Sequence, residues 1–288
     1  MPNEASIGAL YQRADILTEV SISLVLLVFT LLIALGGERM AARYLGEARP
    51  PVPAHTWFNI RYSLVSTVLS SMFQPMVASI SLALTRMLGA GWIAFPSGGW
   101  GWCMAFVSAL VMTDAIEYLF HRAQHRFSLL WKMHELHHSA EHFDVTVTYR
   151  NFWIEPLIKT ACLYPLVGVL FKIPPGVGAA VAMAFMLNNH VVHMNLKFAS
   201  KRHTLIFNNP QYHRMHHSRD PRDYDRNFGA MLLIWDYLFG TLQRPARDQF
   251  PDVGLDSGNA PRILCHAFFW PWCRGRQGAQ AIASPQES

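Results

Sequence analysis

The sequence predicts an all-α membrane protein, a bundle of about four membrane-spanning helices with short helices at the membrane surface. Hydrophobic residues make up 51% of the 288 residues and charged residues only 15%, which is unusual for a soluble protein. Long apolar stretches also recur along the chain, and a bilayer core about 30 Å thick needs roughly 20 helical residues to cross it. The expected crossings are at 16–35, 62–88, 101–120 and, as a hairpin, at 152–192.

The first apolar stretch is expected to remain in the protein as a membrane span. The segment before and at its start carries Asp15 and Glu19 with a single basic residue, Arg13, and no small-x-small cleavage site follows. The second stretch has Gln74-Pro75 near its middle, where a proline can kink a helix. Its length allows only one crossing.

Basic residues gather in three segments, which predicts the orientation of the chain in the membrane. These segments are the loop after the first span, residues 121–159 and residues 197–226. By the positive-inside rule they are cytoplasmic and the N-terminus is outside. The same clustering accounts for the formal net charge of +5, so no nucleic-acid partner is expected. The favoured location is the bacterial inner membrane rather than the endoplasmic reticulum.

Two further apolar runs, 229–239 and 263–272, are too short to span and are expected to lie on the membrane surface. The tail after Arg274 is expected to be disordered. The four cysteines are far apart and include no Cys-x-x-Cys pair, which predicts neither a zinc ribbon nor a disulfide framework.

Ten of the fourteen histidines form four groups with the spacing of metal ligands. The groups are His121 and His125 in HRAQH, His134, His137 and His138 in HELHH, His190 and His193 in HVVH, and His213, His216 and His217 in HRMHH. Residues three and four apart share a helix face, so each group directs its imidazoles to one place. At this histidine content one His-x-x-His-His is expected about 0.03 times per chain, and two occur. A single pair such as HVVH is as well explained by a structural role.

All four groups are expected at the cytoplasmic ends of spans or in the basic segments that follow them, and therefore at one depth. Ten imidazoles are too many for one zinc ion but suffice for two metals with about five nitrogen ligands each. Nitrogen-rich sites with open positions suit iron and O2 chemistry. Four histidines do not share the spacing, although one of them neighbours the second group: His55, His142, His203 and His266.

Other functions fit parts of this pattern. A zinc metalloprotease would use His134, Glu135 and His138, but HRMHH has Arg214 where the glutamate would stand, and the chain has no Asp-Gly element to add an acidic ligand. A carboxylate-bridged di-iron bundle needs two Glu-x-x-His elements, and only one is present. A non-enzymatic membrane cytochrome or a metal transporter leaves most of these histidines unexplained.

The order HRAQH, HELHH, HVVH, HRMHH resembles the fatty acid hydroxylase superfamily, which includes sterol desaturases and fatty acid 2-hydroxylases. The likeness covers roughly Trp102 to Leu242. DAIEYLFHRAQH is similar to the family's Asp-x-x-x-Tyr-x-x-His-Arg-x-x-His, and WKMHELHHS is similar to its tryptophan-led second box. NFGAMLLIWDYLFGT resembles its Asn-[Tyr/Phe]-Gly…Trp-Asp-x-x-Phe-Gly-Thr element.

The resemblance implies a membrane-embedded, non-haem di-iron oxygenase that uses O2 and external electrons to hydroxylate or desaturate a C–H bond of a fatty acyl, sterol-like or alkyl lipid. It carries the ten histidines over as iron ligands. It implies N-terminal spans at 1–100, a di-iron domain at 101–242, and an interfacial segment with a tail at 243–288. No His-Pro-Gly-Gly haem element is present, so a separate ferredoxin or cytochrome b5-type donor with its reductase is implied. The basic cytoplasmic face suits an acidic partner.

Two carboxylates are expected to orient imidazoles from behind. Asp114 and Glu117 lie seven and four residues before His121, on the same helix face. The alternative for Asp114 is a helix-end carboxylate paired with Arg122 or Arg126. The chain departs from many bacterial relatives at Phe152, where they have a further histidine. An ion pair between Arg150 and Glu155 is expected around this position.

Overall fold

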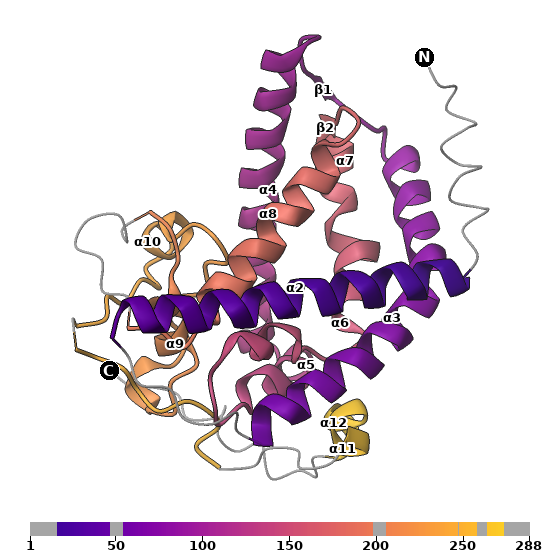
Figure 1. The fold of residues 1–288 in the computed structure, drawn as a ribbon. Helices are drawn as coiled ribbons and strands as arrows, with labels where there is room; N and C mark the ends of the chain where they lie inside the picture. The colour runs from indigo at the N-terminus through magenta and orange to yellow at the C-terminus, as the bar shows by residue number, and fades with distance from the viewer. Residues whose placement is uncertain (1–15, 47–53, 198–205, 247, 258–263, 274–288) are drawn as a thin grey trace. The chain divides into compact units, whose positions relative to one another are not determined.

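The computed structural model describes residues 16–46, 54–197, 206–246, 248–257 and 264–273 (Figure 1). Regular structure in these residues is almost entirely helical, which confirms the all-α prediction. The strands assigned there are two short ones, β1 (Ile93–Ala94) and β2 (Phe171–Lys172), which pair in parallel. His203 and the predicted tail after Arg274 lie outside the described residues.

Among the described residues, three helices are long and apolar enough to cross a membrane: α2 (Ile16–Tyr44), α3 (Ala54–Met87) and α4 (Gly99–Arg126). Each contains most of a predicted crossing and extends beyond it at one or both ends. Helix α3 continues through Pro75. The predicted hairpin at 152–192 consists of α6 (Glu155–Ile158), a π-helical turn (Lys159–Leu163), α7 (Pro165–Leu170) and α8 (Val177–Val192). Helix α8 is apolar but shorter than the other three, so four crossings stay a prediction.

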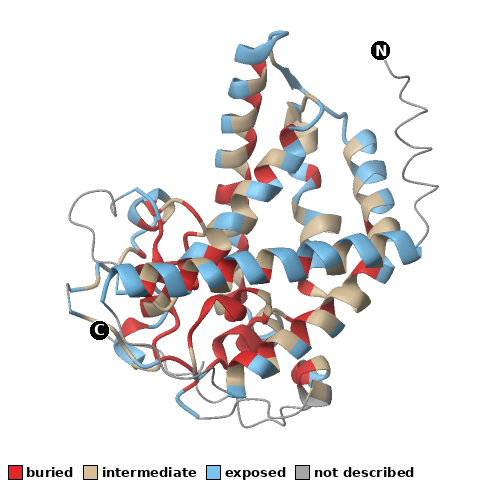
Figure 2. Cartoon of the chain, viewed as in Figure 1, coloured by how far each residue is buried: buried red, intermediate tan, exposed pale blue. Residues whose placement is uncertain are grey.

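Helix α2 leaves much of its apolar surface exposed (Figure 2). Leu17, Val25 and Leu32 are 72%, 68% and 65% exposed. Soluble proteins rarely expose contiguous apolar surface on this scale, whereas a helix that faces lipid does so as a rule. The exposure of α2 therefore supports the membrane prediction.

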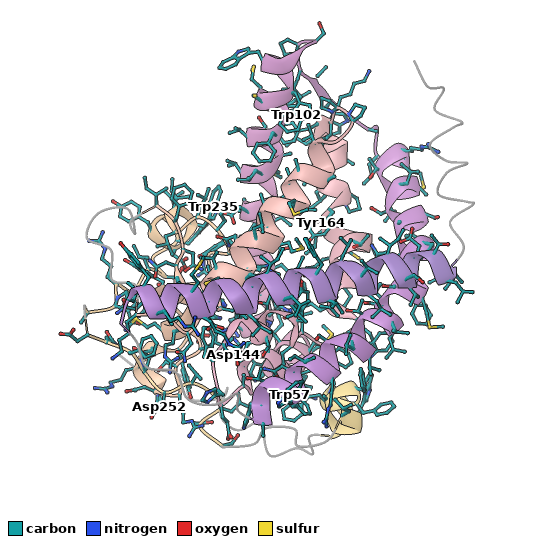
Figure 3. All side chains as sticks on the ribbon, in the orientation of Figure 1. Trp57, Trp102, Asp144, Tyr164, Trp235 and Asp252 are labelled. Carbon is teal, nitrogen blue, oxygen red and sulfur yellow. The ribbon has the colours of Figure 1, made fainter. Side chains whose placement is uncertain are left out.

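The chain divides into two compact units. Unit 1 comprises the described residues up to Ile33, Ser63–Ile116 and Trp153–Met186. Its buried core joins α4 to α7 and α8 through small and β-branched side chains: Ala105, Ala109, Ile116, Val167, Val177 and Val181. Small residues let membrane helices approach closely. Trp102, labelled in Figure 3, stacks on Phe106 beside this core, with ring centroids 5.6 Å apart.

Unit 2 comprises the described residues of Ala34–Tyr62, Glu117–Phe152 and those from Leu187 onward. It contains the C-terminal ends of α4 and α8 together with shorter helices: α5 (Ser128–His138), η1 (Val145–Tyr149), α9 (Pro210–His216), η4 (Pro221–Asp223), α10 (Ile234–Leu238), α11 (Leu264–Phe268) and α12 (Trp270–Cys273). All ten predicted ligands lie in this unit.

Candidate metal centre

Helix α5 carries the HELHH box and buries its C-terminal half. Leucine, lysine, methionine and glutamate favour helix along its length. His134, His137 and His138 follow one another at spacings of three and one, and all three are buried. Because His134 and His138 are four apart, they share a face, while His137 points to a neighbouring direction.

Helix α9 carries the HRMHH box, and its start is fixed by Asn209-Pro210. The side-chain oxygen of Asn209 accepts hydrogen bonds from the backbone N–H groups of Gln211 and Tyr212, at 3.0 and 3.3 Å. Asparagine is a preferred N-cap residue, and proline at the first helical position has no N–H to leave unsatisfied. The cap sets where the short helix begins and so where its histidines point.

Nine of the ten predicted ligands converge in two clusters. The five-histidine cluster is formed by His121, His125, His134, His138 and His216, and the four-histidine cluster by His137, His193, His213 and His217. Within each cluster the ligand nitrogens all lie within 4.8 Å of one another. They come from α4, α5 and α9 and from the residues that directly follow α8 and α9, His193 and His217.

The two His-x-x-His-His boxes divide their residues between the clusters in opposite ways. HELHH gives its first and last histidines to the five-histidine cluster and His137 to the other. HRMHH gives its first and last histidines to the four-histidine cluster and His216 to the other. The fourth residue of each box, His137 or His216, therefore lies in the other cluster from the first and last histidines of its box. The His-Glu-x-x-His pattern alone does not explain this division.

In the four-histidine cluster three Nε2 atoms meet at close range. Nε2 of His193 lies 2.9 Å from Nε2 of His213 and 3.2 Å from Nε2 of His137. Two nitrogens bound about 2.0 to 2.1 Å from one metal ion are separated by about 2.9 to 3.4 Å, depending on the bond angle. The observed spacing fits nitrogens that share one ion.

The five-histidine cluster has buried nitrogens that a metal would satisfy. Among the described residues, the Nε2 atoms of His121, His125, His138 and His216 are buried and have no hydrogen-bond partner. Nδ1 of His121 lies 2.8 Å from the carbonyl oxygen of Phe228, and Nδ1 of His216 lies 2.7 Å from that of Arg226. A carbonyl oxygen only accepts, so Nδ1 carries the proton in both rings and Nε2 keeps its lone pair. Metal-binding histidines typically show this arrangement.

The electrostatics of the clusters favour neutral imidazole. Burial first, and neighbouring imidazoles next, hold the pKa of five rings well below the usual value: His134, His138, His213, His216 and His217. A histidine must be unprotonated to bind a metal. The residues present therefore fit two nitrogen-liganded metal ions.

The other predicted histidine, His190, is buried but lies outside both clusters, and its ring contacts that of Tyr149 at 5.3 Å. Its role as a ligand stays a prediction. His55 and His142 also lie outside the clusters, with their ring centroids 6.5 Å apart.

The two predicted orienting carboxylates lie in different units. Asp114 is fully buried in unit 1, and Glu117 is partly buried in unit 2. The acceptor for Nδ1 of His121 is the backbone oxygen of Phe228 instead. Orientation of imidazoles by Asp114 and Glu117 therefore stays a prediction.

The expected ion pair between Arg150 and Glu155 is wrong. The fully buried Arg150 donates to the carbonyl oxygens of Leu136 and Ser139, at 3.1 and 3.3 Å, and to Oδ1 of Asn59 at 2.9 Å. Glu155 pairs with Lys159 at 3.3 Å. Burial lowers the pKa of Arg150 to about 10, which leaves it charged at neutral pH.

Arg150 thus holds the C-terminal end of α5, directly after its three histidines. The carbonyls at a helix end have no partner within the helix, and a cation there is favourable. Sequence reasoning missed this role because it paired the arginine with the nearest carboxylate in the chain. The positive charge of Arg150 indicated that the residue has acceptors, but the sequence does not show that these are the carbonyl oxygens of Leu136 and Ser139.

Comparison with known proteins gives matches over the region that holds the clusters. Residues 106–241 match a family model described as fatty acid hydroxylase. The chain is 30% identical to alkylglycerol monooxygenase of Danio rerio over 182 residues, 62% of the chain and 39% of that protein. It is 36% identical to ornithine lipid hydroxylase OlsE of Rhizobium tropici over 169 residues, 57% of the chain and 50% of that protein.

A more distant relative is very-long-chain aldehyde decarbonylase GL1-4 of Oryza sativa subsp. japonica, 24% identical over 199 residues, 61% of the chain and 30% of that protein. The chain thus covers between 30% and 50% of the length of these three relatives. No solved structure matches.

Proposed function

From the match of residues 106–241 to a family model described as fatty acid hydroxylase, we propose that the protein is a member of that family and a membrane-bound di-iron oxygenase that hydroxylates a C–H bond of a lipid. O2 and external electrons are the co-substrates. The observation that carries the proposal is the pair of adjacent imidazole clusters, five and four histidines, inside a chain with three apolar helices of spanning length.

The five-histidine cluster would hold one iron ion and the four-histidine cluster the other, with His190 as the tenth predicted ligand. Sites rich in imidazole and lacking thiolate suit iron among other transition metals. When bound, the two ions would supply the activation of O2 and the removal of a hydrogen atom from an unactivated carbon.

The chain itself would contribute shielding and orientation. Phe143 packs against His193 and His217, with ring centroids 5.5 and 5.1 Å apart, and Trp131 packs 5.0 Å from His125. Such an apolar shell limits the access of water to a metal site. The Nδ1 contacts described above hold rings in one orientation, so the ligands need little rearrangement.

The substrate is proposed to be a bilayer lipid, because the more similar relatives are named for alkylglycerol and ornithine lipid. Hydroxylation is favoured over desaturation, since the same relatives are named monooxygenase and hydroxylase. The outcome depends on how the substrate carbon is positioned, because one metal chemistry serves both reactions.

The electron donor is proposed to be a separate ferredoxin or cytochrome b5-type protein with its reductase. The clusters are proposed to face the cytoplasm, where three basic segments would attract an acidic donor. The bacterial inner membrane remains the proposed location.

The zinc metalloprotease alternative explains less of the site. A catalytic zinc takes three protein ligands, whereas His134 and His138 share their cluster with three further histidines. His137, which the protease pattern leaves unused, lies in the other cluster.

Two measurements test the proposal, one on the protein purified from membranes and one on the lipids of whole cells. Elemental analysis is expected to find two iron ions per chain. Lipid extracts of cells with the gene, compared with cells without it, are expected to show one lipid class that has gained one oxygen atom. One tightly bound zinc that survives replacement of His213, with no lipid change, would overturn the proposal in favour of the protease.

A further inference from the structure

One segment, Asp225–Phe228, lies on the Nδ1 side of three imidazoles of the five-histidine cluster. The carbonyl oxygens of Phe228 and Arg226 accept from His121 and His216, and Oδ1 of Asp225 lies 3.4 Å from Nδ1 of His125. Four consecutive residues therefore supply the Nδ1 neighbours of three ligands. We call Asp225–Phe228 the orienting segment.

The backbone of the orienting segment has an uncommon conformation. Asp225 and Asn227 have φ angles of 56° and 57°, and they are the two non-glycine residues with positive φ in the described part of the chain. Aspartate and asparagine adopt this left-handed conformation more readily than other side chains, yet it still costs free energy. Such strain persists only where surrounding contacts hold it.

Asp236 holds the C-terminal end of the segment. Its carboxylate is fully buried and accepts hydrogen bonds from the N–H of Phe228, the N–H of Gly229 and the hydroxyl of Thr241, at 2.8, 2.8 and 2.7 Å. The peptide group between Phe228 and Gly229 therefore donates its N–H to Asp236 and offers its carbonyl oxygen to a metal ligand. One peptide unit separates the carboxylate from that imidazole.

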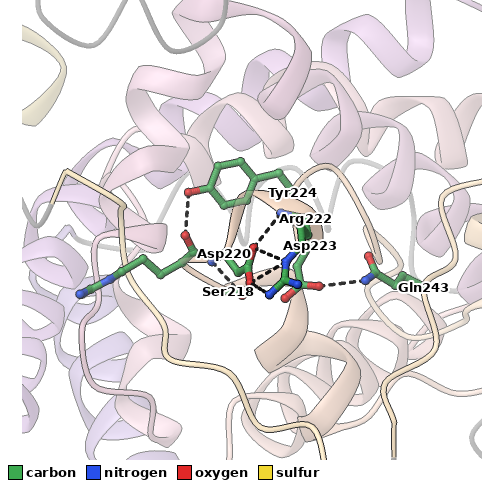
Figure 4. A network of polar contacts seen from close by, with 7 residues as sticks. Ser218, Asp220, Arg222, Asp223, Tyr224 and Gln243 are labelled. Atoms are coloured by element: carbon green, nitrogen blue, oxygen red, sulfur yellow. Dashed lines mark hydrogen bonds and ion pairs between the residues drawn. The ribbon is translucent and has the colours of Figure 1, made fainter. Parts of the chain in front are cut away.

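Gln243 holds the middle of the segment. Its backbone N–H donates to Oδ1 of Asn227 and its carbonyl accepts from Nδ2 of Asn227, at 2.8 and 2.9 Å. Its side-chain amide donates to Oδ1 of Asp223 at 2.8 Å, as Figure 4 shows. These contacts secure the turn in which Asn227 is left-handed.

The four-histidine cluster has no part in this arrangement: within the described residues, the histidines that the orienting segment contacts all belong to the five-histidine cluster. From this asymmetry we infer that Asp236 is a positioning residue for one of the two metals. It acts through the orienting segment, which fixes the tautomer and direction of His121 and His216. The inference rests on the proposed function, since it requires a metal in each cluster.

The test compares metal content and spectra of the full-length protein in detergent. Asp236→Asn keeps the volume of the side chain but replaces one carboxylate oxygen with an N–H donor, which would face a backbone N–H. The expected result is loss of about one of the two irons, with the iron of the four-histidine cluster retained in the Mössbauer spectrum. Asp220→Asn, which changes a partly exposed carboxylate paired with Arg222, is the matched control and is expected to keep both irons.

A second pair of variants covers the case in which Asp236→Asn fails to fold. The side chain of Asp225 is 73% exposed, so its replacement spares the core. Asp225→Gly keeps the left-handed backbone but removes the oxygen near His125, and Asp225→Asn keeps an oxygen there. Asp225→Gly is expected to weaken the binding of one Fe(II) about tenfold, the lower end of the effect of losing a group that contacts a metal ligand. Asp225→Asn is expected to bind that Fe(II) as tightly as the wild-type protein.

Unchanged iron content and affinity in folded Asp236→Asn and in Asp225→Gly would overturn the inference. Equal loss of both irons in Asp236→Asn would also overturn it, because a general structural defect does not select one cluster. Wild-type protein that binds fewer than two metals is a separate result, because it removes the proposed function itself.

Discussion

The imidazole rings of His138 and His217 stack where the two clusters meet, with centroids 4.3 Å apart and planes inclined by 18°. His138 belongs to the five-histidine cluster and His217 to the four-histidine cluster. Each is the last residue of a His-x-x-His-His box, so the boxes on α5 and α9 meet at their final residues. The two ligand sets are therefore neighbours, and these two stacked rings are in contact between them.

Replacing His134 or His137 with alanine is expected to remove different metals, although both residues lie in the same box. His134→Ala should lose the metal of the five-histidine cluster and His137→Ala that of the other, because each removes a nitrogen from only one cluster. Iron content and Mössbauer spectra of the purified variants check this, together with loss of the lipid product. His55→Ala, a histidine outside both clusters, should keep both metals. Full iron content and activity in His137→Ala would contradict the assignment.

Arg150→Lys is expected to lower the thermal unfolding temperature by about 5 °C, since lysine cannot donate to the acceptors of Leu136, Ser139 and Asn59 together. Unfolding of the purified protein in detergent, followed by circular dichroism, measures the change. Arg222→Lys is the matched control, since that side chain is 87% exposed, and it should change the temperature by about 1 °C or less. Equal effects of the two substitutions would show that Arg150 has no special role at the end of α5.

The metal-free protein is expected to lose stability as the pH falls below about 6.5. Burial and neighbouring imidazoles keep the folded-state pKa of His213, His216 and His217 below the value in the unfolded chain. Below that unfolded value the unfolded chain takes up protons that the folded protein does not, so acid favours unfolding. Above it the stability contributed by these groups is fully present.

Unfolding temperatures of the metal-free protein between about pH 8 and about pH 5 measure this dependence. His217→Gln should show a shallower decline, because one of the titrating groups is gone. A melting temperature that rises toward low pH would contradict the direction of these shifts.

The spacing of the histidines predicted that each group directs its rings to one place, because residues three and four apart share a helix face. Their placement at span ends and in the basic segments predicted that the groups come together. It could not predict how the boxes divide between the clusters. That division depends on how α5 and α9 are oriented with respect to α4, which is a matter of tertiary packing. His190 shows the same limit. It forms a His-x-x-His pair with His193, but only His193 lies in a cluster.

The residues that orient the ligands were harder to predict. The sequence drew attention to Asp114 and Glu117 because they are side-chain acceptors on the helix of His121. The acceptors for His121 and His216 are carbonyl oxygens of Phe228 and Arg226, more than 100 residues beyond His121 in the first case. Every residue has a carbonyl oxygen, so the element NFGAMLLIWDYLFGT marked this stretch without indicating which carbonyl oxygens bind. The apolar spans were easier, since length and hydropathy alone define them.

Gly229→Ala is expected to weaken iron binding at the five-histidine cluster without a change of charge. A Cβ at this position would lie 2.6 Å from the carbonyl oxygen of Leu232 and 2.8 Å from Oδ2 of Asp236, so the backbone next to Phe228 must shift. The shift would move the acceptor of His121, and the expected result is loss of about one iron per chain with the four-histidine cluster still loaded. Gly178→Ala, whose Cβ would meet nothing within 4 Å, is the matched control and should keep both irons. A Gly229→Ala protein with two irons and unchanged spectra would show that the position of Phe228 does not govern the metal.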